Sequence, residues 1–417
     1  MKLNLPNKPV IIKNNDFQTI IVRVMFPFYE EEENIAKISV LPTLLSFMSN
    51  KYPTEEEFQK YRKKNYILST GCTKTSVGTT MFLCFSMVIP DSSALSFDNF
   101  DKQFEFFSEL IYNPKVVDGG FDKFEVEREK RNLYMGIENA RKNPRGYQSF
   151  RLPELVDDVG IFSRNLHNHM EQIDELTPQN LYEFYLDIIS KYKPCVFVFG
   201  NVDEDKINTL ADKYLYKNGC ENNILEKRYN HFFVPRDKVN NVVEKTKFKD
   251  SSVTFFYKVK DMSEKDFNYL KLIKGLLTSL SSRMLDKKLR DENDLVYTSY
   301  VSTYLRFGGL EIVSYINKNN KDIVCEKINE VIDELKNPDN ISEYLDNIKD
   351  RRRIGLIRAL DDKFTLFSDK VLELLEVDKN MNDNYQDILN ISADDISKFV
   401  ERLVLDTVYF MEEDDHE

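Results

Sequence analysis

The chain has 417 residues, of which 41% are hydrophobic and 12% aromatic, so it is long enough to build more than one buried core. Its formal net charge of −12 disfavours general binding to nucleic acid or anionic membranes, because both need clustered positive charge. No apolar run follows a basic region near the first residues, so we expect no secretory signal peptide. No apolar run approaches the roughly 18 residues of a membrane span.

The cysteines indicate a reducing compartment. They are odd in number and scattered, with no C-x-x-C pair: Cys72, Cys84, Cys195, Cys220 and Cys325. This pattern is typical of reduced, mostly buried thiols and not of a disulfide framework. We therefore expect a cytoplasmic protein, and the sequence contains no glycine-rich phosphate or dinucleotide motif that would indicate a cofactor.

The first half alternates strand-like and helix-like segments. An opening strand is predicted over 20–28, followed by a long amphipathic segment over 36–50. Strand-like runs follow over 75–88, and a helical register extends over 121–140.

A capped helix and a short strand end this half. Leu181, Phe184, Tyr185, Ile188 and Ile189 have the spacing of a helix with one buried face. At the helix start, a threonine is followed by Pro178, which suits a first turn. The β-rich run over 195–199 comes next.

A polar, weakly periodic segment over 217–248 is predicted to link two halves, 1–216 and 249–417. The second half begins with a strand over 252–260 and an amphipathic segment over 264–290. Strands over 295–316 and a helix over 325–337 follow.

The chain then closes on a copy of the earlier helix-and-strand unit. Ile396, Phe399, Val400, Leu403 and Val404 repeat the first helical pattern, each 215 positions later. Thr177 and Ser392 occupy the same helix-start position, and Ser392 with Asp395 is typical of a capping box. The repeat predicts an α+β fold of two homologous halves, each an antiparallel sheet with helices packed on one face.

One basic run, KDRRRIGLIR over 349–358, interrupts this acidic chain. Its charges alternate with apolar residues, which favours the solvated face of a helix. The alternative is that this helix lines a chamber and attracts acidic peptides.

Three stretches, in this order, resemble the pitrilysin, insulinase and mitochondrial-processing-peptidase superfamily. They are FEVEREKRNLYMGIENARKNP (124–144), LTPQNLYEFY with the following VFVFGNVDEDKINTLADKYL (176–215), and SSRMLDKKLRDENDLVYTSY (281–300). The resemblance extends along nearly the whole chain and implies a clamshell-like fold of two α+β halves.

Active members of that superfamily carry an H-x-x-E-H zinc motif whose glutamate is the general base. Here the motif falls on TLLSF, so Thr43 and Phe47 replace the histidines and Ser46 replaces the base. On the later helix, Met135 and Gly136 stand where active members have glutamates. Residues 1–166 contain no histidine at all, so no zinc site and no peptide hydrolysis by this chain alone are expected.

The chain has four histidines, and two form the pair His167-x-His169. The pair lies in a polar stretch without a third nearby His or Cys, which favours a solvated loop over a metal site.

The resemblance implies a substrate role for Arg290 and Tyr297, which lie seven residues apart across a helix-to-strand corner. Active members carry an arginine and a tyrosine at this spacing that reach the substrate held at the zinc. Guanidinium and phenol groups both donate hydrogen bonds to carbonyl oxygens. The alternative is a structural pair, with Arg290 capping its helix and Tyr297 covering the sheet.

Two functions follow from the resemblance. The chain is similar to the YmfF-type non-catalytic members, which are commonly associated with elongation factor P modification and paired with a zinc-bearing relative. The first function is therefore the non-catalytic, peptide-binding subunit of a heterodimeric zinc peptidase, with the zinc in the partner. The second is a catalytically dead scaffold or peptide-binding interaction protein, for which a homodimer is also compatible with the sequence.

Overall fold

The computed structural model describes residues 2–29, 31–77, 80–91, 97–157, 160–217, 224–226, 231–279, 282–375 and 380–414. The chain divides into two compact units, which are described separately. Unit 1 comprises residues 1–138, 164–229 and 363–378, and unit 2 comprises 139–163, 230–362 and 379–417. None of the described helices is both long and apolar enough to cross a bilayer.

Unit 1 is built on a five-stranded sheet in the order β2-β8-β3-β5-β4. The strands are β2 (Val10–Lys13), β3 (Thr19–Tyr29), β4 (Ser69–Val77), β5 (Thr80–Pro90) and β8 (Cys195–Gly200). Neighbouring strands are antiparallel except β2 and β8. Two short pairs accompany this sheet: β1 (Lys2–Asn4) with β9 (Ile224–Glu226), and β6 (Val116–Val117) with β7 (Gly120–Phe121).

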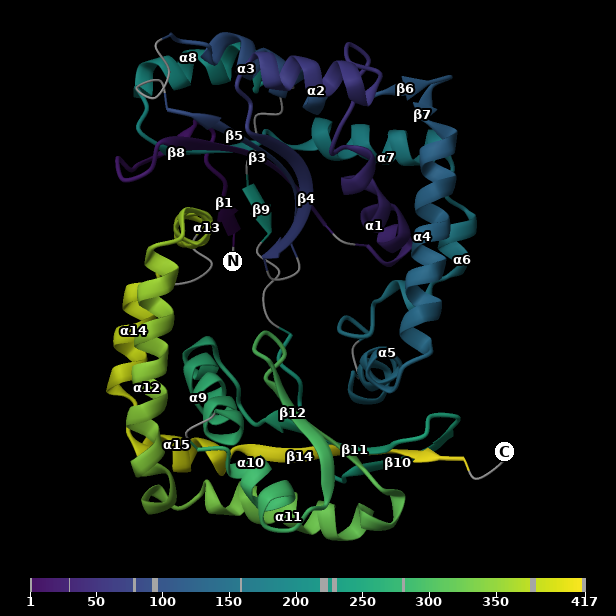
Figure 1. Cartoon of the computed structure of the whole chain (residues 1–417), viewed down its shortest axis with the longest axis vertical. Helices are drawn as coiled ribbons and strands as arrows, with labels where there is room; N and C mark the ends of the chain where they lie inside the picture. The colour runs from purple at the N-terminus through teal and green to yellow at the C-terminus, as the bar shows by residue number, and fades with distance from the viewer. Residues whose placement is uncertain are drawn as a thin grey trace. The chain divides into compact units, whose positions relative to one another are not determined.

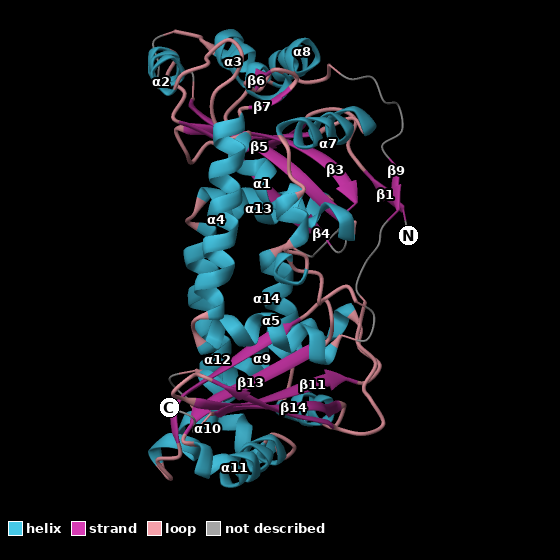
Figure 2. Cartoon of the chain, turned by 90° about the vertical axis from the view of Figure 1, so that its right-hand side faces the viewer, coloured by secondary structure: helices cyan, strands magenta, loops and turns pink. Residues whose placement is uncertain are grey.

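Most helices of unit 1 pack on one face of this sheet (Figures 1 and 2). They are α1 (Ile35–Leu44), α2 (Glu55–Lys64), α3 (Phe100–Tyr112), α4 (Lys123–Arg141), α6 (Glu171–Asp174), α7 (Pro178–Lys191) and α8 (Glu204–Tyr214), with 3₁₀ turns at Glu32–Asn34 and Leu166–Asn168. The opposite face contacts α13 (Lys363–Leu374), whose Phe367 and Val371 join the apolar cluster there.

Unit 2 repeats the topology with the order β10-β14-β11-β13-β12. Its strands are β10 (Asn240–Thr246), β11 (Ser251–Val259), β12 (Val296–Tyr304), β13 (Gly309–Ile316) and β14 (Leu403–Glu413). As in unit 1, the edge strand, here β10, pairs in parallel with the last strand of the half, here β14. This correspondence confirms the fold of two similar α+β halves that the sequence predicts.

The helices of unit 2 also favour one face. They are α9 (Phe267–Thr278), α10 (Met284–Asp286), α11 (Lys321–Glu334), α12 (Pro338–Leu360), α14 (Met381–Asn390) and α15 (Ala393–Val400), with 3₁₀ turns at Glu264–Asp266 and Lys318–Asn320 and a π-helix at Lys287–Asp291. The other face contacts α5 (Pro144–Val156) through Leu152 and Val156. The expectation of helices on one face therefore holds for the larger helical layer, and each second face contacts one helix.

The two predicted helix starts are capping boxes. Thr177 Oγ1 accepts a hydrogen bond from the Asn180 amide at 3.1 Å, and Ser392 Oγ accepts one from the Asp395 amide at 3.2 Å. The second helix is shorter than its periodicity predicts. It ends at Val400, and Leu403 and Val404 belong to β14, since a turn at Glu401 and Arg402 separates them from the helix.

The compact units differ from the boundaries predicted for the halves. Residues 139–163 belong to unit 2 and residues 363–378 to unit 1. Part of the expected 217–248 linker lies outside the described residues, but 240–246 forms β10. This strand is polar and alternates between half-buried and exposed side chains, which explains its weak periodicity in the sequence.

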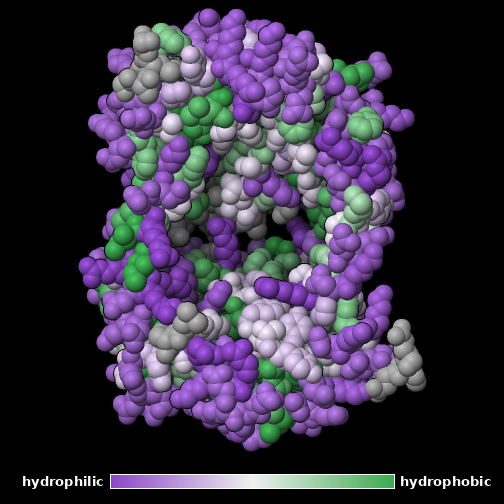
Figure 3. Space-filling model, viewed as in Figure 1, coloured by the Kyte–Doolittle hydropathy of each residue, from purple (hydrophilic) through white to green (hydrophobic). Residues whose placement is uncertain are grey.

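The surface is what a chain with 31% charged residues predicts. Hydrophilic side chains cover most of the face in Figure 3, and hydrophobic ones occur in scattered patches. The basic run over 349–358 lies in α12, where Arg351, Arg353 and Arg358 are exposed. This agrees with a solvated helical face.

Candidate functional site

Arg290 lies in a π-helical turn that leads from α10 into β12. The turn spans Lys287–Asp291, and Leu289 anchors it in the core of unit 2 with no exposed surface. The Leu295 amide donates a hydrogen bond to the Leu289 carbonyl at 2.8 Å, which closes the corner before the strand. Such π-helical turns are rare and occur frequently at functional sites.

Tyr297 lies at an irregularity in the adjoining strand. The register of β12 against β13 shifts between Val296 and Thr298, as in a β-bulge. Val296 and Val301 both point into the same core although they are five residues apart, an odd spacing that regular alternation does not allow. Tyr297 is therefore the extra residue, and the bulge directs its side chain away from the core.

The two side chains at this corner are accessible. The Arg290 side chain is 45% exposed and makes one ion pair, 3.6 Å from Asp291. Tyr297 is 60% exposed, and its hydroxyl forms no hydrogen bond within the described residues. The structure thus places both residues on one corner. Tyr297 is largely exposed, and no helix-capping bond from the Arg290 side chain is found within the described residues.

The positions of the degenerate zinc motif lie at the end of α1. Thr43 is in its last turn, and Ser46 and Phe47 follow it. Ser46 Oγ donates to the Pro42 carbonyl at 2.7 Å and accepts from the Cys72 amide at 3.3 Å, so this hydroxyl ties the helix end to β4. Phe47 packs against the core of unit 1. These contacts are structural and supply no general base.

A small pocket with a volume of about 20 Å³ lies beside these residues. Its walls are Thr43, Leu44, Phe47, Met48, Lys115, Phe121, Asp122 and Glu125. The Lys115 ammonium is 3.3 Å from an Asp122 carboxylate oxygen, so a cation of the chain itself occupies this wall. Within the residues that the structure describes, no group of three or more His, Cys, Asp or Glu side chains could hold a metal ion.

The pocket reaches α4 through Glu125. Met135, ten residues further along this helix, is about 15 Å away along the helix axis. Met135 is 54% exposed, and Gly136 has open space where a side chain would lie. The assignment of Met135 and Gly136 to the former glutamate positions stays a prediction. His169 lies 3.6 Å from both Glu32 and Glu171.

A polar layer, which the sequence did not indicate, lies on the second face of the unit 2 sheet. Gln148 Nε2 donates to Thr254 Oγ1 at 2.9 Å and to Glu311 Oε1 at 3.0 Å, and Tyr304 donates to Glu311 Oε2 at 2.8 Å. Burial raises the pKa of Glu311 above its usual value despite these hydrogen bonds. These residues are far apart in the sequence, and each stands as one polar residue within its own segment. The sequence alone therefore does not show that they meet on one face of the sheet.

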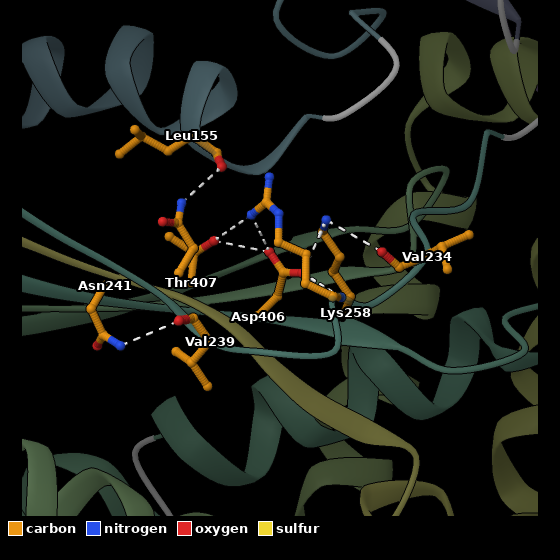
Figure 4. Close-up of polar contacts among 9 residues, drawn as sticks. Leu155, Val234, Val239, Asn241, Lys258, Asp406 and Thr407 are labelled. Carbon is orange, nitrogen blue, oxygen red and sulfur yellow. Dashed lines mark hydrogen bonds and ion pairs between the residues drawn. The ribbon is translucent and has the colours of Figure 1, made fainter.

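A buried ion cluster lies on the same sheet (Figure 4). The Asp406 carboxylate is 3.1 Å from Lys258 Nζ and accepts hydrogen bonds from the Arg236 side chain at 2.9 Å and the Arg236 backbone amide at 3.0 Å. Lys258 and Asp406 are fully buried. The cluster attaches the segment that precedes β10 to the sheet.

Comparison with known proteins agrees with this architecture. Residues 175–351 match the family model of the peptidase M16 inactive domain. The chain is also 22% identical over 407 residues to "Probable inactive metalloprotease YmfF" of Bacillus subtilis (strain 168), which covers 96% of this chain and 94% of that protein.

Solved structures share the fold along the full chain. A conserved protein from Enterococcus faecalis V583 has a TM-score of 0.88 at 19% identity and covers 100% of this chain and 99% of its own. A protease from Helicobacter pylori has a TM-score of 0.75 at 17% identity and covers 99% of both chains. A peptidase M16 inactive domain from Pseudomonas fluorescens has a TM-score of 0.71 at 12% identity and covers 100% of this chain and 98% of its own. Residues 175–351 thus match the peptidase M16 inactive domain, the chain resembles a probable inactive metalloprotease along nearly its whole length, and it shares its fold with these solved structures, while its sequence contains no H-x-x-E-H motif.

Proposed function

We propose that this chain is the non-catalytic, substrate-binding subunit of a heterodimeric zinc peptidase. Arg290 and Tyr297 would donate hydrogen bonds to the carbonyl groups of a peptide held at the zinc of a partner that carries H-x-x-E-H. The Arg290 corner supports this proposal most directly. It combines a π-helical turn with a β-bulge, and it exposes a guanidinium and a phenol whose hydroxyl has no hydrogen bond in the described part of the chain.

The strand that follows the corner also suits a peptide. Among the described strands, β12 is the outer strand of its sheet and has β13 as its single neighbour, so an extended peptide could add to its other edge. The four cysteines among the described residues are free thiols, which supports a cytoplasmic location for the pair.

The test begins with co-expression of this chain and a relative that carries the zinc motif. We expect a one-to-one complex by native mass spectrometry, about one zinc per pair, and cleavage of unstructured peptides. A homodimer that ignores the relative and contains no zinc would contradict the proposal and favour the scaffold function.

Substitutions at the corner then test the roles of its residues. Arg290→Ala in the complex should lower kcat/KM by about ten- to a hundred-fold, because a charged donor to a desolvated carbonyl is lost. Lys287→Ala is the matched control, since Lys287 is an exposed cation in the same π-helical turn. Equal turnover by both variants and the unmodified complex would remove Arg290 from the site.

A further inference from the structure

Arg23 is the one interruption in the most buried strand of unit 1. All the residues of β3 from Ile20 to Phe28 are buried except Arg23, which is partly exposed. Its side chain lies on the second face of the sheet, among the apolar residues Ile21, Met25, Cys84 and Val88. A charged group in such surroundings is costly unless it is paired, so its partners decide what it does.

The guanidinium is held in place but is not neutralised. Arg23 Nε donates to Ser86 Oγ at 3.3 Å, and the guanidinium carbon lies 4.5 Å from the centre of the Phe367 ring in α13. Within the described residues, no carboxylate pairs with Arg23 and its Nη groups have no acceptor. Burial lowers the pKa of the guanidinium below its usual value, in agreement with the loss of solvation.

Open space lies next to this group on the same face. Arg23 pairs with Ser86 across β3 and β5, and Ser86 pairs with Gly71 across β5 and β4. A Cβ atom at Gly71 would meet nothing within 4 Å. Gly71 is on the outer strand, about 10 Å from β3 at the usual strand spacing. The sheet surface over Gly71 and Ser86 is therefore open and leads to the guanidinium of Arg23. We call this surface the shelf.

We propose that Arg23, Ser86 and Gly71 form a binding site for a peptide carboxylate. The planar guanidinium has two Nη groups available for bidentate pairing, and stacking on Phe367 fixes its orientation. A carboxylate suits the site better than a phosphate, because a single charge is repelled less by a protein of net charge −12. The carboxylate comes either from a peptide C-terminus or from an acidic side chain. This site is in unit 1 and does not depend on the role proposed for Arg290.

Three probes test the site on the full chain by isothermal titration calorimetry. They are N-acetyl-tetra-alanine with a free C-terminus, the same peptide as its C-terminal amide, and an amide that contains one glutamate. At least one carboxylate peptide should bind about ten-fold more tightly than the neutral amide, and the stronger of the two identifies the source of the carboxylate. Equal binding of all three, or no binding, would overturn the proposal without any variant.

Two variants then locate the site. Arg23→Met should abolish the preference for a carboxylate. It should also raise the melting temperature of the free protein, because it removes a partly buried charge that no described carboxylate pairs with, while contact with Phe367 is kept. Arg131→Met, at an exposed arginine of α4, is the control and should change neither property. A preference for a carboxylate that survives Arg23→Met would overturn the assignment.

Gly71→Leu tests the shelf without touching Arg23. The backbone of Gly71 does not have a positive φ, and a strand gains stability from a side chain in place of glycine. The variant should therefore fold at least as stably as the natural chain and lose carboxylate binding. Undiminished binding would show that the ligand does not lie over Gly71.

Discussion

The two sheets share a strand order but differ in the chemistry of their second faces. In unit 1 that face is apolar, with Ile21, Met25 and Phe197 around a single arginine. In unit 2 an apolar cluster around Phe256 shares that face with buried polar groups, which include Thr254, Glu311 and an ion cluster. The helix-covered faces are apolar in both units. The helix-covered core is thus apolar in both units, while the second face has a different chemistry in each.

The largest expected effect on stability comes from the ion cluster, which distinguishes the second face of unit 2 from that of unit 1. Asp406→Asn should lower the free energy of unfolding by about 3–5 kcal/mol, because it removes the negative charge that lies 3.1 Å from the fully buried Lys258 ammonium. Urea unfolding followed by circular dichroism measures the change. The double variant Lys258→Met with Asp406→Leu is the control, and it should recover most of the loss. A double variant as unstable as the single one would mean that the charges themselves are needed.

The two capping boxes give a smaller and matched comparison. Thr177→Ala in unit 1 and Ser392→Ala in unit 2 should each reduce stability by about 1 kcal/mol, because each leaves a helix-start amide without its acceptor. Thr177→Ser retains the acceptor and serves as the control in the same unfolding measurement. A loss in one unit only would show that the equivalence of the two helix starts is geometrical and not energetic.

The smallest expected effect is on the pH dependence of stability, which should differ between the two capping boxes. Hydrogen bonds from the Ser392 side chain and backbone lower the pKa of Asp395, whereas Asn180 in the other box does not titrate. Because the folded-state pKa is lowered, the contribution of Asp395 is fully present above the unfolded pKa of about 3.9 and is lost as pH falls through the folded pKa.

Asp395→Asn tests this difference, because it converts the second box into the type found at Thr177. Stability curves measured from neutral to acidic pH should be flatter for this variant than for the natural chain. Identical curves would contradict the assigned role of Asp395.

Local signals in the sequence predicted the repeated elements. The apolar spacing of α7 and α15 and the caps Thr177 and Ser392 depend on residues within one helix turn of each other, so they can be read without the fold. The edge strand β10 could not be recognised, because its polar alternation becomes a strand only through pairing with β14, over 150 residues later.

The corner was only partly predictable. The sequence singled out Arg290 and Tyr297, and it also indicated a helix end and a strand start there. The π-helical turn and the β-bulge were not predicted, since both are departures from periodicity that depend on which leucine and valine side chains reach the core. The shelf beside Arg23 was missed because it needs the register of three strands.

The crossing of α13 into unit 1 also has a consequence for synthesis. The ribosome completes all five strands of the first sheet by Gly200, but the helix that covers their second face ends only at Leu374. Phe197, Phe199 and Ile21 are therefore uncovered while another 170 or so residues are translated, which takes roughly ten to thirty seconds. We therefore expect chaperones to bind this apolar face of the nascent first half.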